Sequence, residues 1–312
     1  MPSPPIDISV LIPCLNEAEN VANITRAVTA EMNKAGVSYE IVFIDNASTD
    51  GTVDIIKAIC ASDPRVRLIV NNKNYGQMRS PTHGIYQTSG RAVIGISADF
   101  QDPPEMIGEF ITRWRRGARI ILGVRQSEDT SLLMRFIRAV GYGFFERFAD
   151  YRVIPGATGF GLYDREVVDC LEKWREPEPF FRGMLVESGF SLETIPYHRP
   201  PRVAGASKNN LWTLLGLALA GVAGSSKRLL RAPIYVSVLT FAAAGLTLIG
   251  ALAWAMLGHD AWGGLIAAVL EFAFALIFMF LGLIGEQVRL ISEVARNVPL
   301  VVEKERVNFP NP

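Results

Sequence analysis

The residues best suited to chemistry lie in one short segment, 97–104, which reads Ser-Ala-Asp-Phe-Gln-Asp-Pro-Pro. Asp99 and Gln101 are two residues apart at the predicted end of a strand, so the carboxylate and the amide oxygen point the same way. Such oxygen ligands suit a hard divalent cation that bridges a diphosphate. The spacing alone is weak evidence, and Asp102, which precedes two prolines, has the alternative role of a helix cap.

A second polar segment, 45–51, follows another predicted strand. Asp45 at the strand end can accept hydrogen bonds from a base or a ribose, whereas residues 48–51 resemble a turn followed by a helix cap. We therefore interpret Asp45 as functional and Asp50 as structural. Neither a G-x-G-x-x-G after the first strand nor a G-x-x-x-x-G-K-[ST] motif is present, so we expect side chains to hold any nucleotide.

These residues need a scaffold that gathers strand ends, and the first part of the chain has the pattern of one. Short connections and alternating runs predict a mostly parallel sheet covered by helices on both faces, in which ligands bind beyond the carboxyl ends of the strands. The predicted strands are 6–13, 40–45, 66–70, 91–97 and 119–124, and the predicted helices are 19–34, 52–61, 80–88 and 104–116.

The second part of the chain is far more apolar. Residues 233–257 contain no charged side chain and exceed the roughly 20 residues that span a membrane as a helix. A second run, 262–285, is interrupted only by Glu271, and the short link between the runs predicts a hairpin. Lys and Arg flank the hairpin on both outer sides and are absent from the link, so both flanks are predicted to be cytoplasmic. The alternative is two buried helices in a large soluble core.

Two features of this apolar part have alternatives of their own. Glu271 is costly at mid-membrane unless it is paired or protonated, and we favour a neutral group bonded across a helix interface, within or between subunits, over a transport role. Residues 211–223 are apolar but too short to span, and they precede a basic cluster. We interpret them as an interfacial helix, with an ordinary core helix as the alternative.

The predicted sheet and the predicted membrane hairpin together divide the chain into four parts. We expect a cytoplasmic catalytic domain at 1–207, an interfacial amphipathic helix at 208–231, a membrane hairpin at 232–286 and a cytoplasmic C-terminal tail at 287–312. The 31 basic and 31 acidic residues balance, which makes nucleic acid a poor candidate partner. The three cysteines have no paired spacing, and the N-terminus lacks the features of a secretory signal, so neither a disulfide framework nor export of the first domain is expected.

Five segments in order resemble the signatures of family 2 inverting glycosyltransferases. The closest group is the polyprenyl-phosphate glycosyltransferases, which includes dolichol-phosphate mannose synthase and the bacterial two-span undecaprenyl-phosphate glucosyl and aminoarabinosyl transferases. The resemblance covers nearly the whole chain. The segments are 13–17 (PCLNE), 44–52 (IDNASTDGT), 74–77 (NYGQ), 98–104 (ADFQDPP) and 202–208 (RVAGASK), with a further match at 282–286 (GLIGE).

The resemblance implies a GT-A fold, which is a Rossmann-like, mostly parallel α/β sheet with helices on both faces. It also implies a role for each matching residue. The nucleotide would lie against Pro13, Leu15, Glu17, Asp45 and Ser97; Asp99 and Gln101 would hold Mg²⁺ or Mn²⁺; Asp99, Arg125 and Arg135 would be catalytic; and Arg202, Ser207 and Lys208 would bind the lipid phosphate. The alternative roles are a surface cation for Arg125 and an amphipathic helix lying on lipid for Arg135.

The implied reaction transfers a hexose from a nucleotide sugar to a polyprenyl phosphate, which yields a lipid-linked donor for the cell envelope. A phosphate monoester is largely dianionic near neutral pH, with a second pKa of about 6, so the nucleophile needs cations that position it rather than a strong base. UDP-glucose is the first choice of donor, before UDP-N-acetylhexosamine, UDP-aminoarabinose, UDP-galacturonate and GDP-mannose. The protein would be integral to the cytoplasmic membrane, contact membrane lipids and form a homo-oligomer, with a tetramer as the first choice.

The favoured hypothesis is an enzyme, and three departures from the family pattern motivate a rival hypothesis. Ser97 stands where the family usually has the first Asp of D-x-D, and Asn46 stands where a second Asp is common. Residues 156–163 lack the Asp and Arg that the family usually carries there. The rival hypothesis is a non-catalytic homologue that binds nucleotide sugar and lipid phosphate. A processive polysaccharide synthase ranks last, because such enzymes need more membrane spans.

Overall fold

The computed structural model describes residues 6–126, 154–177, 179–198, 200 and 299–309, together with scattered positions between 270 and 295. The predicted interfacial helix 208–231, the first predicted span 233–257, Glu271 and most of the second predicted span lie outside the described residues. Within the described part of the chain, no helix is long and apolar enough to cross a membrane.

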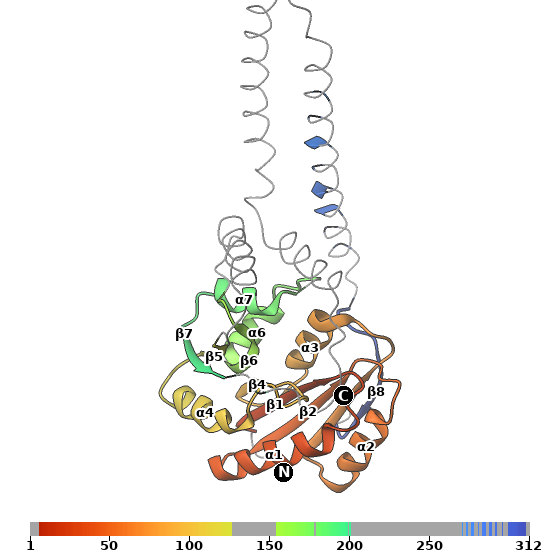
Figure 1. Cartoon of the computed structure of the whole chain (residues 1–312), viewed down its shortest axis with the longest axis vertical. Helices are drawn as coiled ribbons and strands as arrows, with labels where there is room; N and C mark the ends of the chain where they lie inside the picture. Colours follow the sequence, from red (N-terminus) through yellow and green to blue (C-terminus); the bar gives the residue numbers. More distant parts are fainter. Residues whose placement is uncertain are drawn as a thin grey trace, which may run out of the picture.

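The centre of the domain is an eight-stranded sheet in the order β7-β5-β6-β4-β1-β2-β3-β8 (Figure 1). Neighbouring strands are parallel except where β6 meets β4 and β5 and where β8 meets β3. The predicted mostly parallel sheet is therefore confirmed, with two reversed strands. The strands are β1 (Ile8–Cys14), β2 (Tyr39–Asp45), β3 (Val66–Asn71), β4 (Ala92–Gly95), β5 (Ile120–Arg125), β6 (Ala157–Asp164), β7 (Leu192–Tyr197) and β8 (Glu303–Val307).

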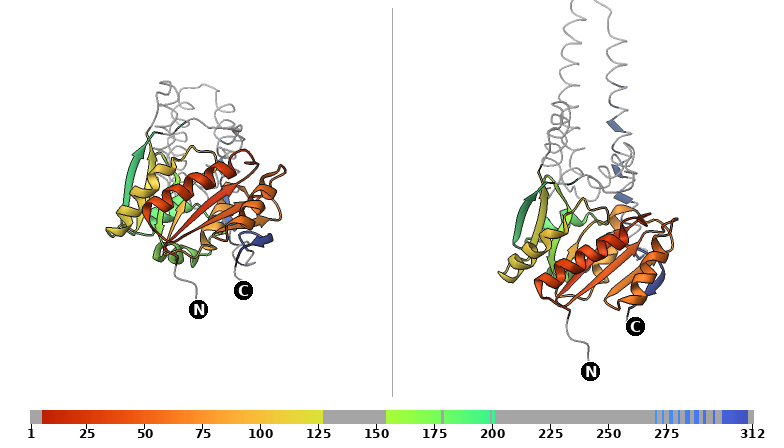
Figure 2. Two further views of the ribbon diagram at one scale, coloured as in Figure 1. Left: turned by 90° about the horizontal axis from the view of Figure 1, so that it is seen from below. Right: turned by 60° about the horizontal axis from the view of Figure 1, so that its bottom comes forward.

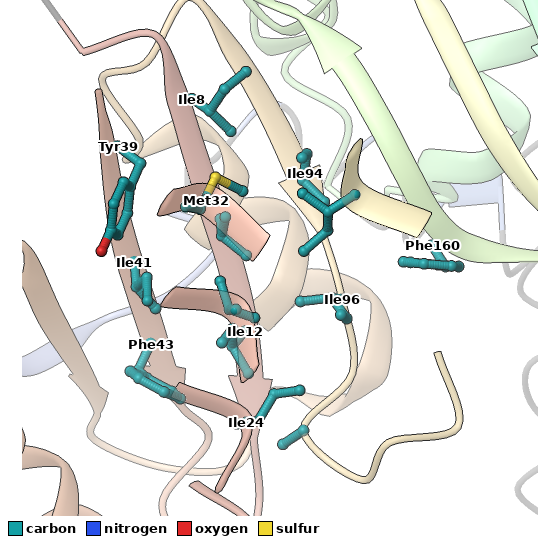
Figure 3. Packing of buried hydrophobic residues seen from close by; sticks show 14 of the residues in the cluster. Ile8, Ile12, Ile24, Met32, Tyr39, Ile41, Phe43, Ile94, Ile96 and Phe160 are labelled. Atoms are coloured by element: carbon teal, nitrogen blue, oxygen red, sulfur yellow. The ribbon is translucent and has the colours of Figure 1, made fainter. Parts of the chain in front are cut away.

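Helices cover both faces of the sheet. Side chains of a strand alternate between faces, so Ile12 of β1 enters one core cluster and Leu11 enters the other. The first cluster packs under α1 (Val21–Ala35), α2 (Thr52–Ser62) and α4 (Ile107–Arg115), with Ile24 and Met32 of α1 over the strands (Figure 3). The second packs under α3 (Gly76–Tyr86), α6 (Arg165–Glu172) and α7 (Phe181–Glu187). A 3₁₀ turn, η1 (Pro104–Met106), precedes α4.

Two predicted boundaries were wrong. The helix predicted at 80–88 extends over Gly76–Tyr86, with Pro81 inside it. The strand predicted at 91–97 ends at Gly95, and the chain then turns into the loop that contains Asp99. The other predicted elements of this part of the chain differ from the observed ones by two residues or fewer at their ends, except the helix predicted at 104–116, whose first three residues form η1 and whose α-helix begins at Ile107.

The two edge strands of the sheet come from distant parts of the sequence. The chain reaches one edge with β7, and it forms the opposite edge with β8, which pairs antiparallel with β3 (Figure 2). Residues 303–307 belong to the segment that the sequence analysis assigned to a C-terminal tail. Part of that tail is thus a strand of the folded domain, which the sequence analysis did not anticipate.

Candidate active site

The loops that follow β1, β2 and β4 lie beyond the carboxyl ends of these three neighbouring strands. Below, this edge of the sheet means the one formed by those carboxyl ends. Each loop contains one non-glycine residue in the left-handed region of backbone space: Asn16 with φ 56°, Ala47 with φ 62° and Phe100 with φ 59°. This conformation costs roughly 1–2 kcal/mol for a residue with a Cβ atom, so the surrounding contacts must hold it. The strain indicates that this edge is built for a purpose other than stability.

Hydrogen bonds join the loop after β1 to the loop after β2. Asn16 Oδ1 accepts from the backbone N of Thr49 at 2.8 Å, and Ser48 Oγ accepts from the backbone N of Asn16 at 2.8 Å. Thr52 Oγ1 accepts from the backbone N of Glu17 at 2.9 Å. Asp50 accepts from the backbone N of Ala18 at 3.3 Å and of Thr52 at 3.0 Å, in agreement with its structural interpretation.

Asp45 is fully buried at the end of β2. Its Oδ2 accepts from the backbone N of Ser48 at 2.9 Å, and its Oδ1 accepts from the Ser48 hydroxyl. Burial raises the pKa of Asp45, and the bonds from Ser48 oppose that rise. Cys14 pairs with Asp45 across β1 and β2, and burial, followed by the charge of Asp45, raises the pKa of its thiol well above the ordinary value. In this arrangement Asp45 shapes the loop after β2, and a direct nucleotide contact stays a prediction.

Asn46 joins the loop after β2 to the loop after β3. Its Oδ1 accepts from the backbone N of Tyr75 at 2.8 Å and from Nδ2 of Asn71 at 3.1 Å. Its Nδ2 donates to Oδ1 of Asn74 at 2.7 Å and to the carbonyl of Gly76 at 3.2 Å. Because an aspartate has no N–H to donate, this position uses chemistry that only an amide supplies.

The loop after β4 is organised around two buried carboxylates. Asp99 Oδ1 accepts from the Ser97 hydroxyl at 2.9 Å and from the backbone N of Gln101 at 3.2 Å. Asp102 Oδ2 accepts from the backbone N of Ser97 at 3.0 Å, and its Oδ1 accepts from the Tyr197 hydroxyl at 3.0 Å. The helix-cap alternative for Asp102 is wrong, because η1 begins after Pro103 and no side chain caps it. Burial raises the pKa of Asp102.

The residues at this loop fit a cation that shares its ligands with substrate. The described residues contain no group of three or more His, Cys, Asp or Glu side chains that would enclose a metal ion. Asp99 nevertheless offers a carboxylate, whose Oδ1 accepts from the backbone N of Gln101. Mg²⁺ usually binds one or two carboxylates and takes its remaining ligands from phosphate and water. Such a site needs a diphosphate to complete it.

Two arginines lie where β5 meets β6. Arg125 ends β5, is half-buried, and donates from its backbone N to the carbonyl of Gly156 at 3.0 Å. Nη1 of Arg182, from α7, donates to the carbonyl of the next residue, Ala157, at 2.8 Å. A Cβ atom at Gly156 would lie 2.6 Å from the Arg125 carbonyl, so only glycine permits this approach. Sequence reasoning missed Arg182, although a lone cation in the apolar segment FRGMLVE was an available signal.

The structure brings most of the described candidate residues to this edge. Pro13 and Leu15 are half-buried at the end of β1, and Glu17 accepts from Nδ2 of Asn20 at 2.6 Å at the start of α1. The strand β1, which contains Pro13 and precedes Leu15 and Glu17, lies between β2 and β4. Asp45 ends β2, and Ser97, Asp99 and Gln101 follow β4. Arg125 lies farther along the sheet, since β6 separates β5 from β4. Arg135, Arg202, Ser207 and Lys208 lie outside the described residues.

Comparison with known proteins gives consistent results. Residues 9–171 match the family model of glycosyl transferase family 2. The chain is 28% identical over 311 residues to the uncharacterized glycosyltransferase YkcC of Bacillus subtilis (strain 168), and this alignment covers 98% of this chain and 96% of the relative. It is 30% identical over 311 residues to the SfII prophage-derived bactoprenol glucosyl transferase of Shigella flexneri, and this alignment covers 97% of this chain and 99% of the relative.

Solved structures of similar proteins include the mannosyltransferase PcManGT from Pyrobaculum calidifontis, in complex with GDP-Man and Mn²⁺. The two structures align with a TM-score of 0.45 and 16% identity, over 95% of this chain and 88% of that chain. The family match spans β1 to α6 and includes the loops that contain Glu17, Asp45 and Asp99. The chain is therefore a glycosyltransferase and belongs to glycosyl transferase family 2.

Proposed function

We propose that this protein transfers a hexose, with inversion, from a nucleotide diphosphate sugar to a polyprenyl phosphate. One observation carries the proposal: the candidate loops follow β2, β1 and β4, three adjacent parallel strands. Adjacent strands lie about 4.8 Å apart, so the ends of β2 and β4 are separated by about 10 Å. A nucleoside diphosphate can bridge that distance, with its nucleoside near Asp45 and Glu17 and its diphosphate near Asp99.

The relatives support the lipid acceptor and the first choice of sugar. Several of them are named bactoprenol glucosyl transferase, and the matches extend over nearly the full length of both chains. Glucose from UDP-glucose is accordingly our first choice, and UDP-N-acetylhexosamine, UDP-aminoarabinose, UDP-galacturonate and GDP-mannose are the alternatives. Asn46 and Ser97, which depart from the family pattern, both form hydrogen bonds that organise the site loops. This observation favours a functional site in which two family residues have been replaced over a site that has lost its function.

The proposed mechanism depends on charge placement. Asp99 and Gln101 would hold Mg²⁺ or Mn²⁺, which when bound would offset the negative charge that the leaving diphosphate gains. Pro13, Leu15, Glu17 and Ser97 would orient the nucleotide. Arg125 would attract the acceptor phosphate toward the sugar, because a guanidinium stays charged at any physiological pH and donates paired hydrogen bonds to phosphate oxygens. We assign Arg135 to the same task, and Arg202, Ser207 and Lys208 to the phosphate of the lipid.

The connectivity of the domain supports the proposed membrane hairpin. The chain leaves the sheet after β7 and re-enters it at β8, and both strands belong to the same sheet. A segment that starts and ends on one folded domain must cross a membrane an even number of times. The two apolar runs 233–257 and 262–285 meet that requirement, with the catalytic domain on the cytoplasmic face of the inner membrane. The homo-oligomer stays a prediction.

A transfer assay tests the proposal. Detergent-purified protein is incubated with polyprenyl phosphate, Mg²⁺ or Mn²⁺ and a panel of radiolabelled UDP- and GDP-sugars, and label in the organic phase is counted. We expect label from one donor, its loss in Asp99→Ala, and a strong reduction in Arg125→Ala. Arg115→Ala is the matched control, since Arg115 is an exposed arginine at the end of α4. Label from no donor, with nucleotide binding intact, would reject the polyprenyl acceptor and favour the non-catalytic reading.

A further inference from the structure

Residues 299–303, which lead into β8, contact the loop 71–76 that follows β3. The backbone N of Asn72 donates to the carbonyl of Val302 at 3.1 Å. The backbone N of Val302 in turn donates to the hydroxyl of Tyr75 at 3.2 Å, and that hydroxyl donates to Oδ1 of Asn72 at 2.7 Å. The Tyr75 hydroxyl therefore closes a small network between the returning chain and this loop.

The same returning segment is also bound by α3, which begins directly after the loop. Arg79 donates from Nε to the carbonyl of Leu300 at 3.0 Å and from Nη2 to the carbonyl of Pro299 at 3.2 Å. His83 Nε2 lies 2.6 Å from Oε1 of Glu303. These contacts join residues more than 200 positions apart, so they fix the end of the apolar half of the chain onto the first half.

On its other side, the loop 71–76 contacts the candidate donor site. The backbone N of Tyr75 donates to Oδ1 of Asn46 at 2.8 Å, and Asn46 directly follows Asp45. Tyr75 thus binds the returning segment through its hydroxyl and the donor loop through its backbone. A displacement of residues 299–303 would reach Asn46 through Tyr75, and also through Asn71, which pairs with Glu303 in the sheet and donates to Asn46 Oδ1.

We propose that Tyr75 is a positioning residue for the donor site, through which the segment returning from the apolar half of the chain holds loops 71–76 and 45–50 in the arrangement that binds nucleotide. This inference rests on the proposed function, because it places the nucleoside of the donor beside the loop that follows β2. It adds that donor affinity depends on a segment that follows the proposed hairpin. A change in the hairpin, such as acceptor binding, would then alter the donor site by linkage.

The decisive variant is Tyr75→Phe in the full-length protein. It removes the hydroxyl and keeps the ring that lies under Lys73 and Arg79 at 5.0 and 5.6 Å. We expect UDP binding, measured by calorimetry with Mn²⁺ in detergent, to weaken about three- to tenfold, which is the usual effect of a lost hydrogen bond. The KM for the donor should rise by a similar factor, with kcat unchanged.

Glu305→Gln is the matched control. Glu305 lies on β8, directly after the returning segment, and its carboxylate forms an ion pair with Lys57 of α2 at 2.6 Å. The substitution removes this ion pair and leaves the contacts of loop 71–76 in place. Hydrogen exchange should be faster at residues 45–50 and 71–79 in Tyr75→Phe and unchanged there in Glu305→Gln.

Unchanged UDP affinity and unchanged exchange in Tyr75→Phe would overturn the inference and leave the proposed function intact. Equal weakening in both variants would also overturn it, because β8 would then act only as a stabilising edge strand. A wild-type protein that binds neither UDP nor GDP would overturn the inference together with the proposed function.

Discussion

The hydroxyl of Tyr197 donates a hydrogen bond to Oδ1 of Asp102 at 3.0 Å, which joins the last residue of β7 to the loop after β4. Tyr197 also pairs in register with Arg125 of β5. Asp102 in turn accepts from the backbone N of Ser97, whose hydroxyl contacts Asp99. One buried bond therefore fixes the candidate metal loop relative to the strand that ends in a candidate phosphate-binding arginine.

The buried carboxyl group of Asp102 should make stability depend on pH. Burial raises its pKa in the folded protein, so its contribution is most favourable below the unfolded value of about 4 and is lost as the pH rises through the folded value. In Asp102→Asn the amide can accept from Ser97 N and donate to the Tyr197 oxygen, without a charge. We expect the melting temperature of this variant to rise relative to wild type as the pH increases above about 4.

Asp54→Asn, on the exposed side of α2, is the control for this measurement and should show no such divergence. A constant difference between Asp102→Asn and wild type across the pH range would show that the pKa of Asp102 is the same in the folded and unfolded protein. That outcome would contradict the predicted direction.

Much of the first half of the fold could be predicted because its signals are local. The apolar run that became β2 was predicted as 40–45 and extends over Tyr39–Asp45. Polar residues directly after these runs predicted where the candidate site lies, since parallel strands place all their carboxyl ends on one side. Asp45 and Asp50 differ in burial, since Asp45 is fully buried and Asp50 is exposed, and the functional role of Asp45 stays a prediction.

The features that could not be predicted depend on residues far apart in the sequence. The strand β8 has the sequence EKERV, which has no apolar alternation and resembles a solvated tail. Its partners include Lys57 and His83, more than 200 residues earlier, which no local pattern indicates. The segment Asp-Pro-Pro is a local signal, and it suggested a helix cap as the alternative role of Asp102. The side chain that donates a hydrogen bond to Asp102 is that of Tyr197, which is 95 residues away in the sequence.

The substitution Ser97→Asp tests the candidate metal loop. The Ser97 hydroxyl lies 2.9 Å from Oδ1 of Asp99, so an aspartate here would place two carboxylates close together. Without a cation their repulsion destabilises the loop, and a bound divalent cation relieves it. We expect a lower melting temperature than wild type in EDTA and a larger increase on addition of Mn²⁺. Ser97→Asn controls for the change in size, and an identical Mn²⁺ response in both variants would argue against a metal at Asp99.

The substitution Asn46→Asp tests whether the amide at this position is required. Aspartate cannot donate to Asn74 Oδ1 or to the Gly76 carbonyl, which lie 2.7 and 3.2 Å from Asn46 Nδ2. Two oxygens would then face a buried carboxylate, and we expect a loss of about 1–3 kcal/mol in stability, with weaker UDP binding. Asn72→Asp is the matched control, because Asn72 accepts from the Tyr75 hydroxyl through an oxygen that aspartate retains. Unfolding in denaturant compares the two, and equal stabilities would count against this role of the amide.

The contact between β6 and β5 requires glycine at position 161. A Cβ atom there would lie 2.3 Å from the carbonyl oxygen of Ile121 and 3.1 Å from Cα of Leu122, both in the backbone of β5. Backbone cannot move aside as a flexible side chain does, so we expect Gly161→Ala to lose about 1–3 kcal/mol in stability.

Gly108, on the helix α4, provides the opposite test of the same substitution. Nothing lies within 4 Å of a Cβ atom added there, and alanine is favoured over glycine inside a helix by about 0.5–1 kcal/mol. Gly108→Ala should therefore stabilise the protein while Gly161→Ala destabilises it, as measured by denaturant unfolding of both variants. If Gly161→Ala were neutral, β5 and β6 would have to lie farther apart than their register implies.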